Sequence, residues 1–134
     1  MIATEADLPF IVELGREAHA GSSWDGVAAF DAESFESSCR MLMAREDAAV
    51  FVADRGCLWM ARSKLYFNHA ESVALDVFYY ATKNGDALRR EAQRWAGPGL
   101  MALSRNDATD VRLDKLYSRA GFVPVEHQYI RRLS

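Results

Sequence analysis

The C-terminal part of the sequence constrains the fold most, because it joins a helical apolar face to an abrupt stop. Leu113, Leu116, Tyr117 and Ala120 recur at helical spacing and share one face of a predicted helix. Gly121 follows at the place where a helix ends in a left-handed residue, a conformation that costs glycine little. The apolar residues of the stretch 122–133 predict a final strand. The fold must therefore hold a helix that delivers a tyrosine and then turns sharply into a strand.

Two amphipathic helices are predicted in the N-terminal third. The first has Thr4 or Asp7 as its N-cap and carries an apolar stripe of Leu8, Ile11, Val12, Gly15 and Ala18. The second starts at the N-cap Asp31 and aligns Phe35, Cys39 and Leu42.

Three strands should follow, then a helix, a strand, and the C-terminal helix and strand. Residues 49–53 and 58–65 flank a turn at 54–56 and predict a hairpin. Residues 72–80 predict a third strand with Ala74, Asp76, Phe78 and Tyr80 on one face. The stripe Leu88, Ala92, Trp95 and Ala96 predicts the third helix, and residues 100–104 a buried strand. Only Met1 and Ile2 are left for any strand ahead of the first helix.

Size and charge narrow the function classes. The 134 residues suit one domain spanning 1–134. A net charge of -3 argues against a nucleic-acid partner and favours a cationic one. Cys39 and Cys57 match no zinc-binding or redox spacing, so no metal site is expected. Unpaired cysteines also indicate a reducing compartment. No apolar run suits a membrane span and no basic leader is present, so a cytoplasmic location is expected.

The C-terminal Leu-Tyr-x-x-x-Gly-Phe-x-Pro-Val arrangement resembles the closing segment of the GNAT N-acetyltransferase superfamily. Shorter pieces at 4–9, 50–53, 66–68 and 76–80 look like the same superfamily, particularly its short bacteriophage members. The resemblance implies an α+β GNAT-like fold, in which a mixed, mostly antiparallel sheet has helices on both faces. It also implies acetyl-coenzyme A as co-substrate, in a slot where the strands at 72–80 and 100–104 splay apart.

The resemblance also implies a coenzyme-binding loop ahead of the third helix. In typical members an Arg/Gln-x-x-Gly-x-Gly/Ala loop holds the pyrophosphate with its backbone N–H groups. Aligned through Trp95 and Ala96, Tyr80 here takes the Arg/Gln position, Lys83 the middle glycine and Gly85 the last position. The loop is thus poor in glycine and shorter than usual.

Two interpretations of this loop stay open. In the first, Lys83 contacts a phosphate while the backbone of Asn84, Gly85 and Asp86 caps the pyrophosphate. In the second, the loop is an ordinary polar turn and Asp86 is the N-cap of the helix, where its carboxylate would take the place of a phosphate.

Further coenzyme contacts are expected from Val77 and Phe78 on the central strand and from Asn106 before the last helix. Asn106 and Asp110 equally suit helix capping. The resemblance places His19 and Trp24 on the acceptor side, although such residues more often simply pack.

The resemblance assigns Tyr117 as the acid that protonates the leaving thiolate; the alternative is a packed aromatic on the helix face. Asp76 is the candidate base, because its apolar strand neighbours should raise its pKa. His69 and Glu71 are the next candidates for the base, and a structural carboxylate is the alternative for Asp76.

The resemblance implies an N-acetyltransferase that moves an acetyl group directly from acetyl-coenzyme A to a primary amine, on a small molecule or on a protein. The alternative is an inactive GNAT-fold binding or structural protein, encoded by a phage and associated with the virion, with a phage or host protein as its partner. The C-terminal strand would also suit pairing in a homodimer.

Overall fold

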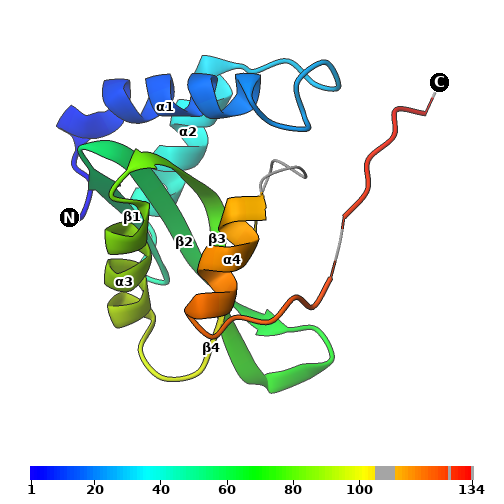
Figure 1. Cartoon of the computed structure of the whole chain (residues 1–134). Coiled ribbons are helices and arrows are strands. Elements are labelled where there is room, and N and C mark those ends of the chain that lie inside the picture. Colours follow the sequence, from blue (N-terminus) through cyan, green and yellow to red (C-terminus); the bar gives the residue numbers. More distant parts are fainter. Residues whose placement is uncertain (105–110, 127, 134) are drawn as a thin grey trace.

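The computed structural model describes residues 1–104, 111–126 and 128–133 (Figure 1). A short 3-10 turn, Glu5–Asp7, leads into the first helix. The helices are α1 (Leu8–Ala20), α2 (Ala32–Met43), α3 (Gly85–Ala96) and α4 (Val111–Arg119), and the strands are β1 (Ala48–Ala53), β2 (Arg55–Leu65), β3 (Asn68–Lys83) and β4 (Leu100–Ala102).

Side-chain caps are present at the predicted starts of the first two helices. Thr4 and Asp7 form a reciprocal capping box, in which the Asp7 carboxylate accepts from the Thr4 backbone N–H at 2.8 Å. Asp31 caps α2 by accepting from the Glu33 backbone N–H at 3.1 Å. Local side chains thus cap the 3-10 turn ahead of α1 and the start of α2.

The sheet has the order β1-β2-β3-β4. The first three strands pair antiparallel, and β4 pairs parallel to β3 after the crossover through α3. Ahead of α1, the expected remnant of a strand is a single bridge between Ile2 and Phe51. This is a mixed, mostly antiparallel sheet, as predicted.

Helices cover both faces of the sheet, and β1 and the first half of β2 are buried on both sides (Figure 1). On one face, α1 and α2 pack on Val50, Trp59 and their neighbours. On the other, α3 packs on Phe51 and Leu58 through Leu88 and Ala92. The two apolar layers fix the position of β3, whose C-terminal end reaches the candidate site.

The predicted alternation along β3 is wrong, because the strand contains an extra residue at Val77. Phe78 lies opposite Trp59, whereas Asp76 lies opposite Met60, so Val77 has no partner in the ladder. Asp76 therefore faces the α3 side, and Phe78 faces the α1 and α2 side. A regular period of two cannot reveal such a bulge.

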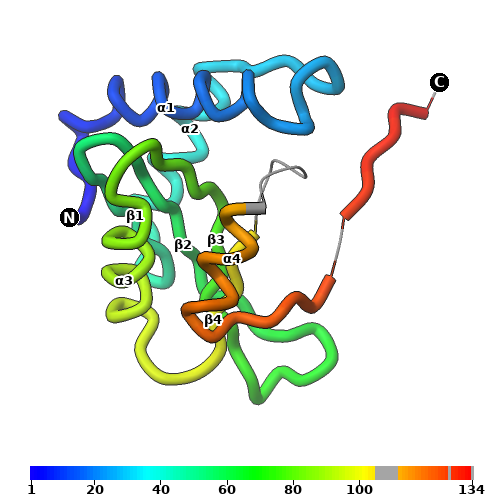
Figure 2. The backbone as a smooth tube through the Cα atoms, viewed as in Figure 1, coloured from blue at the N-terminus to red at the C-terminus, as the bar shows by residue number. Residues whose placement is uncertain are grey.

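The predicted final strand is also wrong for the residues that the structure describes. The segments 122–126 and 128–133 contain no strand and run away from the sheet (Figure 2). Val125 and Tyr129 are 83% and 90% exposed. A strand requires a hydrogen-bonding neighbour as well as an apolar pattern, and here none is supplied. Arg132 instead donates a hydrogen bond to the Val27 carbonyl, so the tail contacts the α1–α2 loop.

Candidate functional site

A cavity of about 1050 Å³ lies at the C-terminal end of β3. Five parts of the fold line it: the end of α1 with the loop after it, α2 through Phe35, the end of β3, the turn into α3, and α4. One part of its lining is aromatic and includes Trp24, Phe30, Phe35, Phe78 and Tyr80; another is polar and includes Lys83, Asn84, Gly85, Asp86 and Arg112. The cavity thus brings together five of the predicted coenzyme residues, Phe78 among them.

The turn into α3 is held in an unusual backbone conformation. Asn84, the residue before the helix, is left-handed with φ of 62° and makes no side-chain cap. The Tyr79 hydroxyl donates a hydrogen bond to the Gly85 carbonyl and so joins β3 to the first residue of α3. A Cβ at Gly85 would lie 3.2 Å from the Cβ of Ala81, so glycine suits this close approach. The Asn84 side chain therefore does not cap the first backbone N–H groups of α3. Anion binding at a helix N-terminus requires such uncapped groups.

Asp86 is not the N-cap of α3, contrary to the second interpretation of the loop. It lies inside the helix, where its carboxylate accepts from Arg89 at 2.8 Å and pairs with Arg90 at 3.1 Å. The hydrogen bond from Arg89 lowers the pKa of Asp86. Two guanidinium groups thus offset the negative charge that the sequence places beside the expected phosphate position.

Asp76 and Tyr117 meet at a third residue, Ser104, just after β4. The Asp76 carboxylate accepts from both the backbone N–H and the hydroxyl of Ser104 at 3.1 Å. The Tyr117 hydroxyl donates to the Ser104 carbonyl at 2.8 Å. The structure therefore joins both predicted catalytic residues through a residue that the sequence did not single out. Neither of them lines the cavity, although their neighbours Phe78 and Leu116 do.

The predicted rise in the pKa of Asp76 is present. Burial raises the pKa of this carboxyl to about 6, against the lowering effect of its hydrogen bonds from Ser104. His69 and Glu71, the other candidates for the base, are exposed near the start of β3 and do not line the cavity.

The C-terminal motif has a clear local explanation. Gly121 is left-handed with φ of 91°, and the backbone N–H of Phe122 donates to the Tyr117 carbonyl at 2.9 Å. Gly121 in turn donates to the Ser118 carbonyl at 3.1 Å, which completes a Schellman motif. The rings of Tyr117 and Phe122 pack with their centroids 5.9 Å apart. The motif thus ends α4 and fixes the tyrosine at the same time.

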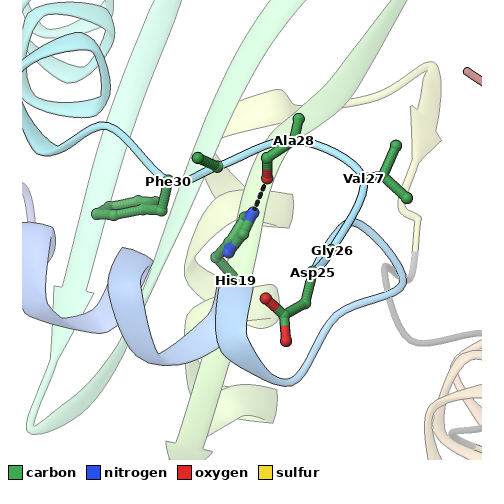
Figure 3. Close-up of a pocket in the computed structure, with 7 residues that line it drawn as sticks. His19, Asp25, Gly26, Val27, Ala28 and Phe30 are labelled. Atoms are coloured by element: carbon green, nitrogen blue, oxygen red, sulfur yellow. Dashed lines mark hydrogen bonds between the residues drawn. The ribbon is translucent and has the colours of Figure 1, made fainter.

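The α1–α2 loop lines one side of the cavity. His19 Nε2 lies 2.7 Å from the Ala28 carbonyl, so it carries the proton and ties the loop to α1 (Figure 3). The loop and His19 enclose a smaller hollow of about 460 Å³, which also includes Asp25 (Figure 3). Trp24 lines the main cavity and is 42% exposed. His19 thus has a structural role in this geometry.

Val77 does not join the cavity, and two further candidates fall outside the residues that the structure describes. Val77 is the bulge residue and is 51% exposed, outside the cavity lining. Asn106 and Asp110 lie outside the described residues.

Sequence reasoning missed the basic side of the cavity. Arg112, Lys115 and Arg119 on α4 all line it. Their spacing of three and four residues, which places them on one helical face, was visible in the sequence.

Among the residues that the structure describes, no group of three or more His, Cys, Asp or Glu side chains is placed to hold a metal ion. Within the same residues, no helix is long and apolar enough to cross a membrane.

No protein-family model matches the chain, and neither does any curated protein. Solved structures do match over nearly the whole length. A putative acetyltransferase from Agrobacterium tumefaciens str. C58 has a TM-score of 0.71 and 16% identity, over 99% of this chain and 98% of that one. The aminoglycoside antibiotic 6'-N-acetyltransferase AAC(6')-IG from Acinetobacter haemolyticus has a TM-score of 0.69 and 19% identity, over 100% and 97%.

A third structure holds a ligand. AAC(6')-Iy, solved with the bisubstrate analogue CoA-S-monomethyl-acetylneamine, has a TM-score of 0.73 and 14% identity, over 100% of this chain and 96% of that one. At these identities the likeness shows the fold. The expected GNAT-like α+β fold is therefore confirmed.

Proposed function

We propose that this protein transfers an acetyl group from acetyl-coenzyme A to a primary amine. The observation that carries the proposal is the cavity at the end of β3, which lies between the turn into α3 and α4 in a chain with an acetyltransferase fold. A cavity of about 1050 Å³ is large enough for a coenzyme arm and an acceptor together.

The reaction is direct. The neutral amine nitrogen attacks the thioester carbonyl, the new C–N bond forms, the C–S bond breaks and the thiolate leaves. In this proposal Asp76 accepts the proton of the amine and Tyr117 supplies a proton to the thiolate, both through water, because neither side chain lines the cavity. A covalent cysteine intermediate is disfavoured, because burial raises the pKa of Cys39 to about 11 and of Cys57 to about 12.

The acceptor is proposed to be cationic in its resting form and to enter beside the aromatic part of the cavity. Glu17 lines the cavity with Tyr80, and burial together with the Glu17 carboxylate raises the pKa of that tyrosine. A carboxylate among aromatic rings favours an ammonium group. Polyamines, aminoglycosides, lysine side chains and protein N-termini share this group.

Acetyl-coenzyme A is expected to raise the melting temperature of the purified protein. Because a ligand that binds only the folded state stabilises it by mass action, 100 times its dissociation constant should add about 2.7 kcal/mol. Differential scanning fluorimetry with a concentration series measures the shift, with free coenzyme A as a second ligand and adenosine as a control. A melting temperature that does not move at millimolar acetyl-coenzyme A contradicts the proposal.

Replacing Asp76 by Asn is expected to lower kcat/KM and to remove its rise with pH near 6, because the amide cannot accept the proton of the amine. The measurement is kcat/KM as a function of pH, from about pH 5 to about pH 9, for the wild type and the Asp76→Asn variant. Superimposable profiles would rule out Asp76 as the base.

Stability gives an independent control on Asp76. Its folded-state pKa of about 6 lies above the unfolded value of about 3.9, so the folded protein holds the proton more tightly. Asp76 therefore contributes most to the free energy of unfolding below about pH 4. Its contribution falls by up to about 3 kcal/mol as the pH rises to about 6. Urea denaturation should show this fall in the wild type and less of it in the Asn variant.

A binding role without catalysis is the second candidate, and the exposed tail favours it. Val123, Val125, Tyr129 and Leu133 are each at least 75% exposed after α4. Such a segment suits strand pairing with a second copy or with a phage or host protein.

A further inference from the structure

The cavity has a larger aromatic surface than an amine nitrogen alone needs. One part of its lining consists of the rings of Trp24, Phe30, Phe35, Phe78 and Tyr80, here called the aromatic cluster. Trp24 is 42% exposed and the other four are half-buried, so each ring keeps surface that the protein does not cover. An apolar group bound in the cavity would remove this surface from water, which is favourable.

The aromatic cluster is held in place by the core beneath it. The ring centroid of Phe35 lies 5.2 Å from those of both Phe30 and Phe78. Phe35 and Phe78 also pack on the buried ring of Trp59, at 4.6 Å and 5.3 Å. A Cβ at Gly15 would lie 2.4 Å from the Phe35 ring, so glycine lets this ring lie directly on α1. The cluster is thus formed in advance, and a ligand would not have to order it.

Among the lining residues that the structure describes, one carboxylate is left to receive an ammonium group. The two lining carboxylates are Glu17 on α1 and Asp86 on α3, and Asp86 forms ion pairs with Arg89 and Arg90. Glu17 lies beside the Tyr80 hydroxyl, because burial and then this carboxylate raise the pKa of Tyr80. The ammonium group of an incoming amine is therefore expected beside Glu17, next to an aromatic ring.

This arrangement discriminates among amines that all carry an ammonium group. A polyamine or an aminoglycoside carries several ammonium groups, and the hydroxyls of an aminoglycoside need hydrogen-bond partners when they leave water. Aromatic rings supply neither carboxylates nor such partners. An amine with a single ammonium group and an aromatic ring matches one carboxylate beside a wall of rings.

We propose that the acceptor is a small aromatic monoamine, bound with its ammonium group beside Glu17 and its ring against the aromatic cluster. The inference rests on the proposed function and narrows its acceptors to one chemical class. The ammonium group releases one proton on becoming the neutral amine, and the new C–N bond replaces the C–S bond. The products are the N-acetylated amine and free coenzyme A, whose thiol carries the second proton.

The test compares kcat/KM for four amines at saturating acetyl-coenzyme A, from the thiol released and the mass of the acetylated product. The aromatic monoamine is 2-phenylethylamine, and hexylamine is a monoamine without a ring. Spermidine and kanamycin carry several ammonium groups. We expect 2-phenylethylamine to be about 10- to 100-fold better than spermidine or kanamycin. It should be about two- to tenfold better than hexylamine, because rings pair favourably beyond the area that they bury.

Replacing Trp24 by alanine links this preference to the aromatic cluster. Its hydrogen bonds with Ser22, Val27 and Ala28 are made by its backbone, so the truncated side chain should not disturb the loop. We expect kcat/KM for 2-phenylethylamine to fall about three- to tenfold, mainly through KM, and that for spermidine to stay within about twofold. Trp24→Phe keeps a ring and should retain most of the preference.

Tyr66→Ala is the matched control, because it removes a ring that is 89% exposed and outside the cavity lining. Its kcat/KM for each amine should stay within about twofold of the wild type. Melting curves establish that the variants fold. If Trp24→Ala does not, Phe30→Leu takes its place, with the same selective loss expected.

The outcomes separate the inference from the proposed function. If spermidine, kanamycin or hexylamine is used as well as 2-phenylethylamine, the inference is overturned and the proposed function survives. An equal loss for every amine in the Trp24→Ala variant overturns the inference in the same way. If none of the four amines is acetylated, the inference is overturned, and the melting-temperature shift with acetyl-coenzyme A decides the proposed function separately.

Discussion

Replacing Tyr117 by phenylalanine is expected to lower kcat by about 10²–10⁴-fold with both substrates saturating, if the hydroxyl protonates the leaving thiolate. The substitution keeps the ring, its contact with Phe122 and the Schellman end of α4, because only the hydroxyl is removed. Initial rates with acetyl-coenzyme A and an accepted amine measure the effect, and KM should change little.

The structure makes this a sharp test, because the Tyr117 hydroxyl also has a structural bond to the Ser104 carbonyl. Loss of that bond alone should cost about 0.5–1.5 kcal/mol of stability and leave kcat close to normal. Tyr129→Phe, which removes a hydroxyl from a side chain that is 90% exposed, is the matched control. A variant at Tyr117 that melts earlier but turns over normally would show that the residue only holds Ser104.

The largest stability effect is expected from Gly56→Ala in the hairpin, where a Cβ has no room. It would lie 2.5 Å from the Cβ of Ala81 and 2.9 Å from both the Ala81 Cα and the Tyr80 carbonyl oxygen. Backbone atoms cannot rotate away, so β2 and β3 must separate locally. We expect the free energy of unfolding to fall by roughly 1–3 kcal/mol in urea titrations.

Gly21→Ala provides the control, since a Cβ there would have its nearest neighbour at 3.9 Å. That variant should stay within about 0.5 kcal/mol of the wild type. Because Ala81 also contacts the space at Gly85, the Gly56 variant should weaken acetyl-coenzyme A binding as well. Equal stability of the two variants would mean that β2 and β3 are less tightly packed than the structure shows.

The sequence predicted features that depend on local chemistry. Asp31 caps α2 and Gly121 ends α4 in a left-handed conformation, because a cap and a sharp turn are set by a few adjacent residues. The apolar stripes likewise predicted α1 and α3. The expected sheet followed from the strand patterns and from the resemblance.

Features that depend on distant partners were not predicted. The bulge at Val77 arises from the pairing of β3 with β2, and the apolar tail forms no strand in the described segments because it meets no strand edge. The same holds for the site. Lys83, Asn84, Gly85 and Asp86 do line the cavity, but the role of Ser104 and the approach of α4 required the fold.

The bulge at Val77 turns the two halves of β3 toward opposite faces of the sheet. Before it, Asp76 faces the layer that contains α3 and reaches Ser104; after it, Phe78 faces the opposite layer and the aromatic part of the cavity. Under the proposed function, the aromatic residues that would meet the acceptor and the carboxylate that would take its proton therefore lie on separate stretches of β3. If that proposal holds, substitutions in the aromatic stretch should change which acceptor is used without altering Asp76 and its contact with Ser104.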